Sequence, residues 1–579
     1  MRLLTCLPAL LLGGCAFAPA SPSATQSSTA SAPRPAQPGL LQQCQALTSS
    51  FQHPATELRA TTVVPAGTLN NAGRPVAEHC LVTGQMHRRV SPVDGQTYAI
   101  GFEMRLPRDW SGRFLYQANG GTDGMVATAD GGSALGSGGV LTNALQRGVA
   151  VISSDAGHSA AQNPLFGLDP QARLDYGYQA VAKLTPMAKA LIVAAYGRPA
   201  DRSYIAGTSN GGRHAMVAAA RLPEAFDGVL AQAPGFNLPR AAAANMATVK
   251  HWERIAPTKV VNGQPDVESA LPTADRALVA RAILARCDAL DGLADGLVHD
   301  TEACHAAFNL QRDVPTCSGA RDGSCLSAEQ KQALARAHAP SFTSNGTPVY
   351  SGFAFDPGLV QPGWAEWKFR SALGRQRNPV SIAFIMSSPP SGDLSMATDA
   401  SRSAAFAVSF DLDSEFPKLF ATQGPYTESG ISFMTPPGDM LFEPFMRHGG
   451  KLLVVHGVAD PIFSSEDTAA WYRRLSQHHK SATSNFARYF QVPGMGHSRG
   501  GPATDQYDGL AALIDWVEGG QAPQRIVATA RQAGNPGGAN PDVPAQWQPQ
   551  RSRPLCPYPS VARYTGGDTA SAASFTCLP

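Results

Sequence analysis

Short apolar runs alternate with helical patterns from about residue 40 to residue 235. Runs of consecutive positions that favour burial predict strands at residues 113–117, 148–152, 202–206 and 228–232. Apolar residues at helical spacing predict a helix over residues 178–196. Strands that alternate with helices indicate an α/β fold with a mostly parallel, doubly wound sheet.

This alternation stops near Pro234 and returns only at residues 451–455 and 487–492, followed by a helix at about 507–517. The stretch between holds four cysteines, Asp-rich turns, Pro pairs and scattered Trp and Phe. We therefore predict one α/β domain interrupted by a large insertion, rather than three serial domains. The predicted boundaries are 39–235 and 445–579 for the α/β domain, and 236–444 for an inserted lid domain.

The first residues are typical of an export signal. A basic start is followed by an apolar run through Leu12, and this run is too short to cross a bilayer. The sequence Leu12-Gly13-Gly14-Cys15 resembles a bacterial lipobox, so residues 1–15 are predicted as a signal peptide with Cys15 as the lipidated residue. The alternative is cleavage near residues 18–20 and release without a lipid.

Residues 16–38 are rich in Ser, Ala, Pro and Gln, which predicts a flexible linker. We expect an outer-membrane lipoprotein, or a periplasmic or secreted protein, of a Gram-negative bacterium. Membrane contact is expected only through the N-terminal lipid. The formal charge is +2 and only 16% of residues are charged, so no nucleic acid partner is expected. The protein is expected to be a monomer.

The chain has ten cysteines, and loss of Cys6 and Cys15 with the signal leaves eight. An even number in an exported chain predicts disulfide bonds. Proximity along the sequence suggests three pairs and leaves a fourth: Cys287–Cys304, Cys317–Cys325, Cys556–Cys577 and Cys44–Cys80.

A serine lies at the centre of Gly207-Thr208-Ser209-Asn210-Gly211, between the predicted strand at 202–206 and an Ala-rich helical stretch. In such a G-x-S-x-G turn the strained backbone exposes the hydroxyl above the N-terminus of the next helix. The glycines are needed because a Cβ would clash where strand and helix pack closely. Ser209 is therefore the predicted nucleophile, and an ordinary Ser/Asn turn is the alternative.

A serine nucleophile needs a base and an acid that orients the base. His497 follows the strand at 487–492 in a glycine-rich loop, and Asp460 follows the strand at 451–455. The order Ser, Asp, His is that of the α/β-hydrolase fold, which we predict here. His456 lies nearer its strand and is expected to make a structural hydrogen bond. Asp155 is the rival acid, but it precedes the nucleophile.

Two backbone N–H groups are needed to hold an oxyanion. The residue after the nucleophile, Asn210, is expected to supply one of them. The other is expected from the glycine-rich loop of residues 119–124, with Gly121 preferred to Gly120.

An acidic loop follows Cys287 in the insertion. Its carboxylates are spaced by three and four residues, with glycines that allow a tight wrap, and oxygen ligands suit a hard cation. The predicted ligands of a structural Ca²⁺ are the side chains of Asp288, Asp291 and Asp295 and the carbonyls of Leu293 and Leu297. The alternative is a set of Asx turns with solvated carboxylates. No organic cofactor is expected.

These features together resemble the tannase and feruloyl esterase family, which includes bacterial mono(hydroxyethyl) terephthalate hydrolases. The resemblance rests on the Ser209 turn, residues 363–367, 456–460 and 494–497, the acidic loop and the tail at 553–577. It implies a serine carboxylic-ester hydrolase that acts on small esters of aromatic acids, and it supports the cysteine pairs. Trp364 and Trp367 are candidates for the acyl pocket, and Arg370, Arg375 and Arg377 for binding a substrate carboxylate.

One departure from the family is clear. Its members usually carry a disulfide between the residue before the nucleophile and the residue after the histidine, and these positions are Thr208 and Ser498 here. A hydrogen bond between the two is the expected replacement. Two alternatives stay open: an esterase of the same fold for aliphatic or hydroxyalkanoate oligomer esters, and an inactive, calcium-stabilised surface lipoprotein that binds phenolics.

Overall fold

The computed structural model describes residues 33–579, except 136–138, 258–259, 262–263, 320 and 375–376. Cys15 and the predicted signal peptide lie outside the described residues, so the lipid anchor stays a prediction. Among the helices that are described, none is both long and apolar enough to cross a membrane.

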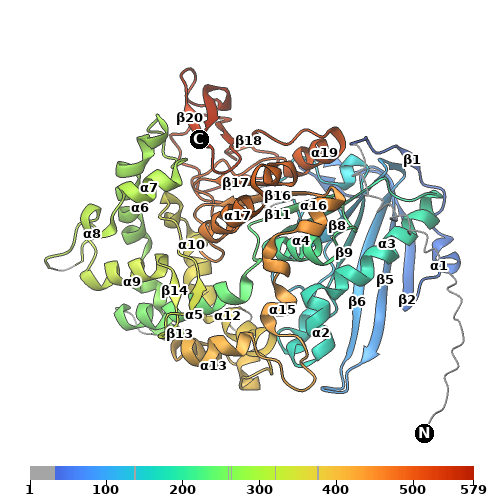
Figure 1. Ribbon diagram of the computed structural model, residues 1–579, viewed down its shortest axis with the longest axis horizontal. Coiled ribbons are helices and arrows are strands. Elements are labelled where there is room, and N and C mark those ends of the chain that lie inside the picture. The colour runs from blue at the N-terminus through green and yellow to red at the C-terminus, as the bar shows by residue number, and fades with distance from the viewer. Residues whose placement is uncertain (1–32, 136–138, 258–259, 262–263, 320, 375–376) are drawn as a thin grey trace, which may run out of the picture.

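A nine-stranded sheet lies at the centre of the α/β part of the molecule (Figure 1). Six neighbouring strands are parallel and confirm the predicted mostly parallel sheet. In spatial order they are β17 (Ala487–Val492), β16 (Lys451–Gly457), β11 (Gly228–Gln232), β10 (Arg202–Thr208), β8 (Arg113–Ala118) and β9 (Ala150–Ser154). Every strand predicted from the apolar runs is among them.

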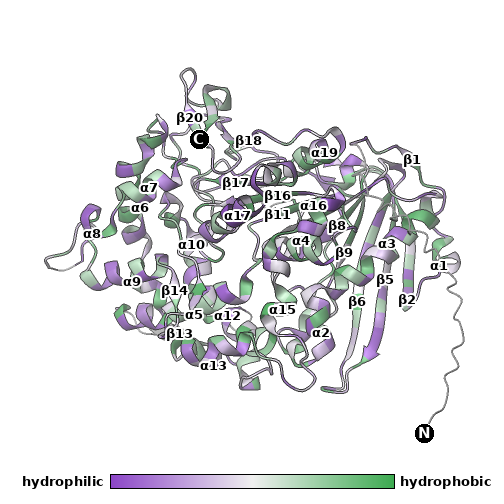
Figure 2. Cartoon of the chain, viewed as in Figure 1, coloured by the Kyte–Doolittle hydropathy of each residue, from purple (hydrophilic) through white to green (hydrophobic). Residues whose placement is uncertain are grey.

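Three antiparallel strands extend the sheet beyond β9. They are β6 (Thr97–Pro107), β5 (His79–Val90) and β2 (Thr56–Val64). Strands β5 and β6 carry hydrophilic as well as hydrophobic residues (Figure 2), in keeping with a sheet edge that is covered on one face only. Because they lack a continuous apolar run, the sequence pattern did not predict them.

Successive residues of the parallel strands point to opposite faces of the sheet. Ile205 packs on one face with α3 (Ala180–Tyr196) and α4 (Asn210–Arg221). Tyr204 and Ala206 pack on the other face with α19 (Gly509–Gly519). The helices predicted at 178–196 and 507–517 are thus confirmed, and each covers one face.

The inserted segment 236–444 adds no strand to this sheet in the part that the structure describes. It packs a separate hydrophobic core beside the sheet (Figure 1). The main helices around that core are α5 (Leu238–Ile255), α6 (Thr273–Cys287), α9 (Ala328–His338) and α13 (Ala400–Val408). The same core includes Ile462 and Phe463 from the loop after β16, so the insertion rests on the carboxyl edge of the sheet.

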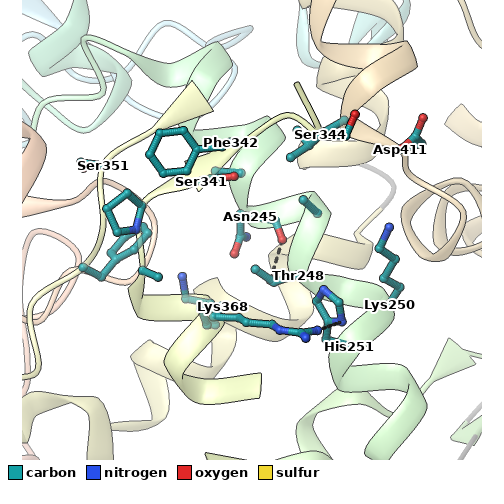
Figure 3. A pocket seen from close by; sticks show the side chains of 18 of the residues that line it. Asn245, Thr248, Lys250, His251, Ser341, Phe342, Ser344, Ser351, Lys368 and Asp411 are labelled. Carbon is teal, nitrogen blue, oxygen red and sulfur yellow. Dashed lines mark hydrogen bonds between the residues drawn. The ribbon is translucent and has the colours of Figure 1, made fainter. Parts of the chain in front are cut away.

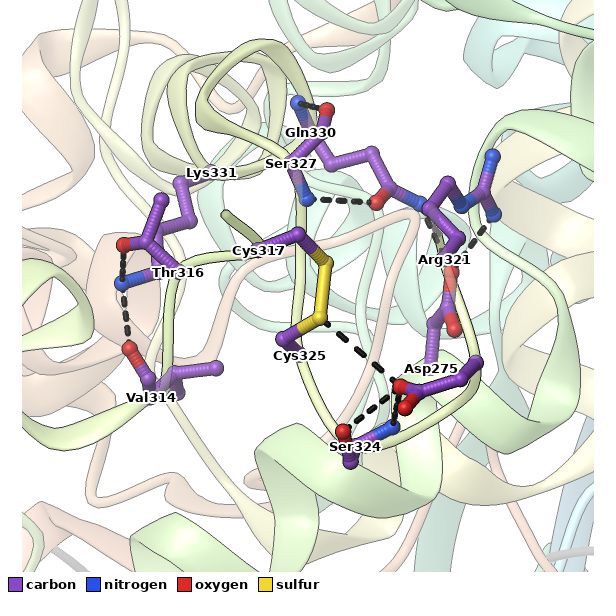
Figure 4. The surroundings of a disulfide bond; sticks show 11 residues. Asp275, Val314, Thr316, Cys317, Arg321, Ser324, Cys325, Ser327, Gln330 and Lys331 are labelled. Carbon is purple, nitrogen blue, oxygen red and sulfur yellow. Dashed lines mark hydrogen bonds and ion pairs between the residues drawn. A yellow bond between two sulfur atoms is a disulfide. The ribbon is translucent and has the colours of Figure 1, made fainter. Parts of the chain in front are cut away.

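All four predicted disulfides are present: Cys44–Cys80, Cys287–Cys304, Cys317–Cys325 and Cys556–Cys577. Figure 4 shows the surroundings of Cys317–Cys325, which closes a short loop of the insertion. An ion pair of 2.7 Å between Arg321 of this loop and Asp275 of α6 links the loop to the helix.

Candidate active site

Ser209 stands at the sharp turn between β10 and α4. Its φ of 64° and ψ of −123° are strained for an L residue, and such a turn holds the side chain clear of the sheet. The predicted need for glycines is confirmed. A Cβ on Gly207 would lie 2.3 Å from the backbone of Gly211, and a Cβ on Gly211 would lie 2.2 Å from the Ala118 oxygen.

A continuous chain of hydrogen bonds joins Ser209, His497 and Asp460. The distance from His497 Nε2 to Ser209 Oγ is 2.9 Å, and from His497 Nδ1 to Asp460 Oδ2 it is 2.7 Å. The carboxyl ends of parallel strands meet at one edge of a sheet, so the loops after β10, β16 and β17 bring the three residues together. With Nδ1–H donating to Asp460, Nε2 is free to accept the serine proton.

Asp460 is fully buried and held as a carboxylate by four donors. Oδ1 accepts the N–H groups of Ile462 at 2.9 Å and Phe463 at 3.1 Å. Oδ2 accepts from His497 and, at 3.2 Å, from His456. Burial alone raises the pKa of Asp460, but the charge and hydrogen bonds of the two histidines outweigh it and hold that pKa well below its usual range.

The two alternatives from the sequence have other partners. Asp155 does not contact His497; its Oδ1 accepts the N–H groups of Gly101 and Gly157, each at 2.9 Å. His456 makes the expected structural hydrogen bonds, since its Nδ1 lies 2.9 Å from Thr468 Oγ1 while Nε2 contacts Asp460.

Gly121 and Asn210 both border the pocket that contains Ser209. Gly121 has a φ of 69° and open space at its Cβ position. Gly120 instead lies against the turn, because a Cβ there would be 3.2 Å from the Thr208 oxygen. Gly121 therefore lines the pocket beside Ser209, as the preference for it over Gly120 expects.

A buried polar network lies behind these two residues. The Asn210 amide donates to Asp123 Oδ2 at 2.8 Å, and its oxygen accepts from Arg213 Nε at 2.6 Å and from Tyr176 at 3.3 Å. His214 Nε2 lies 2.9 Å from the same Asp123 oxygen. The network ties the glycine-rich loop to the first turn of α4.

No pattern in the sequence indicated this network, although Asp123 lies in the glycine-rich loop of residues 119–124 and the serine motif is followed closely by Arg213 and His214. Burial raises the pKa of Asp123 to about 7 and lowers the pKa of His214 well below its usual value. The contact between them is therefore a hydrogen bond to a neutral imidazole near neutral pH, rather than an ion pair.

Aromatic rings surround His497 and the serine. The ring of Trp367 meets His497 edge to face at 4.7 Å between centroids, and Phe463 does so at 5.3 Å. The pocket around Ser209 measures about 60 Å³ and also includes Arg377, whose guanidinium lies 5.0 Å from the centroid of Trp367. Trp367 separates it from a cavity of about 520 Å³ that reaches His497 and Arg499.

Trp364 is the exception among the predicted pocket residues, and that prediction is wrong. It lies in α10 (Pro362–Ala365), is 3% exposed and packs on His338 and Phe369. Trp367 lies in the next turn, a π-helical segment η8 (Glu366–Arg370), and faces the pocket instead.

Of the two candidate arginines that the structure describes, Arg377 lines the pocket and Arg370 does not. Arg370 is largely exposed and pairs with Glu268 and Glu366, each at 3.1 Å. Arg375 lies outside the described residues.

The predicted hydrogen bond between Thr208 and Ser498 is wrong, since these two described residues do not bond to each other. Thr208 Oγ1 instead lies 3.4 Å from the Ala134 oxygen and 3.5 Å from the Gln232 amide.

The acidic loop after Cys287 contains features that favour a cation and others that compete with it. Asp288, Asp291 and Asp295 each accept backbone N–H groups within the loop, as in the alternative of Asx turns. Asp291 Oδ2 is buried and has no partner among the described residues. Burial, with the nearby charges of Asp295 and Asp288, raises the pKa of Asp291 to about 7. Asp295, however, pairs with Arg551 at 2.7 Å and with Arg553. Within the described chain, no group of three or more His, Cys, Asp or Glu is arranged as a metal site.

The sheet, the strained serine turn and the Ser209–His497–Asp460 hydrogen bonds define a serine hydrolase of the α/β-hydrolase fold. The family model for tannase and feruloyl esterase matches residues 80–578. The chain therefore belongs to the tannase and feruloyl esterase family, and it is a carboxylic ester hydrolase. This membership sets aside the alternative of an inactive binding lipoprotein.

Relatives of known name cover nearly the whole chain. It is 37% identical over 550 residues to mono(2-hydroxyethyl) terephthalate hydrolase of Piscinibacter sakaiensis. The matched region covers 90% of this chain and 89% of the relative. It is 28% identical to a probable feruloyl esterase B of Emericella nidulans, over 83% of both chains. The solved feruloyl esterase B of Aspergillus oryzae has the same fold, with a TM-score of 0.69 at 23% identity over 92% of this chain and 99% of that one.

Proposed function

We propose that the protein hydrolyses esters of aromatic acids through an acyl-enzyme on Ser209. His497 Nε2 takes the proton of Ser209 as its oxygen attacks the ester carbonyl, and Asp460 orients the imidazole and stabilises its charge. The N–H groups of Asn210 and Gly121 hold the oxyanion. His497 then protonates the departing alcohol. In the second half of the reaction His497 deprotonates a water molecule, which attacks the acyl-enzyme and releases the acid and Ser209.

The observation that carries this proposal is the unbroken hydrogen-bond chain from Ser209 Oγ to Asp460, in a pocket bordered by aromatic rings. Trp367 and Phe463 offer flat apolar walls for an aromatic acyl group. The names of the relatives, a terephthalate monoester hydrolase and feruloyl esterases, support the same class of substrate.

A substrate panel tests the acyl specificity. We expect methyl ferulate, methyl gallate or a terephthalate monoester to give a higher kcat/KM than a hydroxybutyrate dimer, with products identified by chromatography. A preference for the dimer would replace the proposal with the hydroxyalkanoate alternative.

The contribution of Arg377 is tested with the same panel. An exposed guanidinium at the pocket can pair with the free carboxylate of a terephthalate monoester, and such a pair contributes modestly. Arg377→Ala is expected to raise KM for this substrate by about twofold to fivefold and to leave KM for methyl ferulate unchanged. Equal changes for both substrates would assign Arg377 to pocket shape rather than to charge.

The acidic loop is proposed to hold a structural Ca²⁺ through Asp288, Asp291 and Asp295, with the carbonyls of Leu293 and Leu297. The unpartnered Asp291 oxygen supports this proposal. A bound ion would neutralise the clustered carboxylates and link the loop beside the Cys287–Cys304 disulfide.

Removal of calcium is therefore expected to lower the melting temperature by several degrees, because a ligand at about 100 times its Kd stabilises by about 2.7 kcal/mol. Thermal unfolding with and without EGTA measures this. Asp291→Ala is expected to abolish the EGTA effect, whereas Asp322→Asn, an exposed change in the same insertion, is expected to retain it. An unchanged melting temperature of the native chain in EGTA would contradict the proposal.

Export with a lipid on Cys15 remains part of the proposal. The four disulfides support an oxidising compartment.

A further inference from the structure

A second cavity lies within the insertion, between α5, α9, η8 and the start of α14 (Leu412–Glu415). It measures about 330 Å³, within the range of about 300–1,000 Å³ that is typical of small-molecule sites. Figure 3 shows its lining, in which the amino end of Lys368 and the amide of Asn245 face the same space. None of these residues belongs to the pocket around Ser209.

Two deeply buried polar side chains in this cavity have end groups that make no hydrogen bond to a described residue. Asn245 is 2% exposed, and neither its amide nitrogen nor its oxygen is hydrogen-bonded within the described chain. Lys368 is also 2% exposed, and its ammonium makes no hydrogen bond or ion pair with a described residue; its near neighbour is the ring of Phe353 at 3.9 Å. Unpaired buried groups of this kind are costly, and proteins keep few of them without a ligand or another role.

The other charged groups restrict what can bind. Lys250, His251, Arg336, Asp411 and Asp413 also line the cavity, and Figure 3 shows Lys250 and Asp411 on the side away from Lys368. Arg336 is already bonded to His251 Nδ1 at 3.2 Å. The two aspartates offset part of the positive charge of Lys250 and Arg336, which favours a singly charged anion over phosphate or sulfate, and Phe353 offers an apolar wall. A small, partly apolar molecule with a single negative charge suits this arrangement of charged and apolar groups.

We propose that the cavity is a binding site for a small organic monocarboxylate, held by the ammonium of Lys368 and the amide of Asn245. The carboxylate accepts from both groups, and the body of the molecule lies against Phe353. This site is separate from the ester-hydrolysing pocket, and the proposal does not rest on the proposed substrate. Lys368 directly follows Trp367 in the same π-helical turn. A ligand on Lys368 would therefore contact the residue next in sequence to Trp367, which lines the catalytic pocket.

The charge state of Lys368 gives the site a pH dependence. Burial lowers the pKa of Lys368 to about 7, while the more distant Asp460 raises it. His338 also faces Lys368, and burial lowers the pKa of His338 to about 3, so His338 is neutral. Burial also lowers the pKa of His251. A bound carboxylate favours the charged form of Lys368, so binding weakens as pH rises through 7. At pH 8, where the free lysine is mostly neutral, Lys368 takes up a proton when the carboxylate binds.

Calorimetry with benzoate tests the proposal on the full exported chain, after Ser209 has been blocked by a covalent aryl phosphonate. Mass spectrometry confirms the block, and failure of labelling would speak against the serine mechanism rather than against this site. We expect benzoate to bind at pH 6 and at least tenfold more weakly at pH 8.5. At pH 8, the measured heat is expected to change with the ionisation enthalpy of the buffer. Neutral benzamide and sulfate are expected not to bind.

Substitutions locate the site. Lys368→Met and Asn245→Leu are each expected to weaken benzoate binding at least tenfold, and Lys368→Met to remove the buffer dependence. Lys418→Met, the same exchange at a more exposed lysine of the insertion, is expected to change neither. Benzoate binding that survives both cavity substitutions, or no binding to the native chain at pH 6, would overturn the proposal. Thermal unfolding checks each variant, and Asn245→Leu provides the test on its own if Lys368→Met does not fold.

Discussion

Replacing Ser209 with alanine is expected to lower kcat for p-nitrophenyl acetate by about 10⁴- to 10⁶-fold, because the residue supplies the attacking oxygen and acts as a unit with His497 and Asp460. The Cβ of alanine fits the same strained turn, with φ of 64°, so the fold is expected to be kept. Initial rates with purified enzyme measure the loss, and thermal unfolding verifies the structure.

Ser481→Ala is the matched control. Ser481 is exposed in η13 (Lys480–Ala482), and its replacement is expected to leave kcat within about twofold. If the Ser209 variant kept a rate close to that of the native chain, another nucleophile would have to be sought, and the roles assigned to His497 and Asp460 would fail with it.

Replacing Asp460 with asparagine is expected to lower kcat by about 10⁴-fold with little change in KM. The amide is of similar size, but it carries no charge to stabilise the imidazolium and can favour the wrong tautomer of His497. His456 loses its charged partner as well, so both histidines that now donate to Asp460 Oδ2 are affected. Rates at several substrate concentrations separate kcat from KM.

Asp155→Asn provides the comparison, since it is the same chemical change in the rival acid. The asparagine oxygen can still accept the N–H groups of Gly101 and Gly157, so activity is expected to stay within about tenfold of the native chain. A larger loss in Asp155→Asn than in Asp460→Asn would reverse the assignment of the acid.

The parallel strands could be predicted because each is buried on both faces and therefore reads as an unbroken apolar run, as at Leu452–Val455 in β16. The antiparallel strands β2, β5 and β6 could not. They lie at the edge of the sheet, where one face meets solvent, and their mixed composition does not differ clearly from that of loops.

The catalytic residues could be found because strong local constraints act on them. A Cβ on Gly207 or on Gly211 would lie 2.3 Å or 2.2 Å from backbone atoms, so glycine is required at both, and the fold fixes the order Ser, Asp, His. Trp364 and Trp367 show the limit of this reasoning. The helix changes from α- to π-helical winding between them, so Trp364 faces the core and Trp367 faces the pocket. The spacing of the two residues in the sequence does not reveal such a change.

The sequence by itself determined the α/β fold, the serine turn and the likeness to one family of esterases, because these depend on local backbone demands and on residue order. Only the tertiary structure decided which polar side chains meet. Asp123 lies in one loop and Asn210 and His214 in a helix more than eighty residues later, yet they form one network. Likewise, Lys368 and Asn245 face one cavity from separate segments of the insertion. Such contacts arise from the packing of distant segments, and no pattern along the chain encodes them.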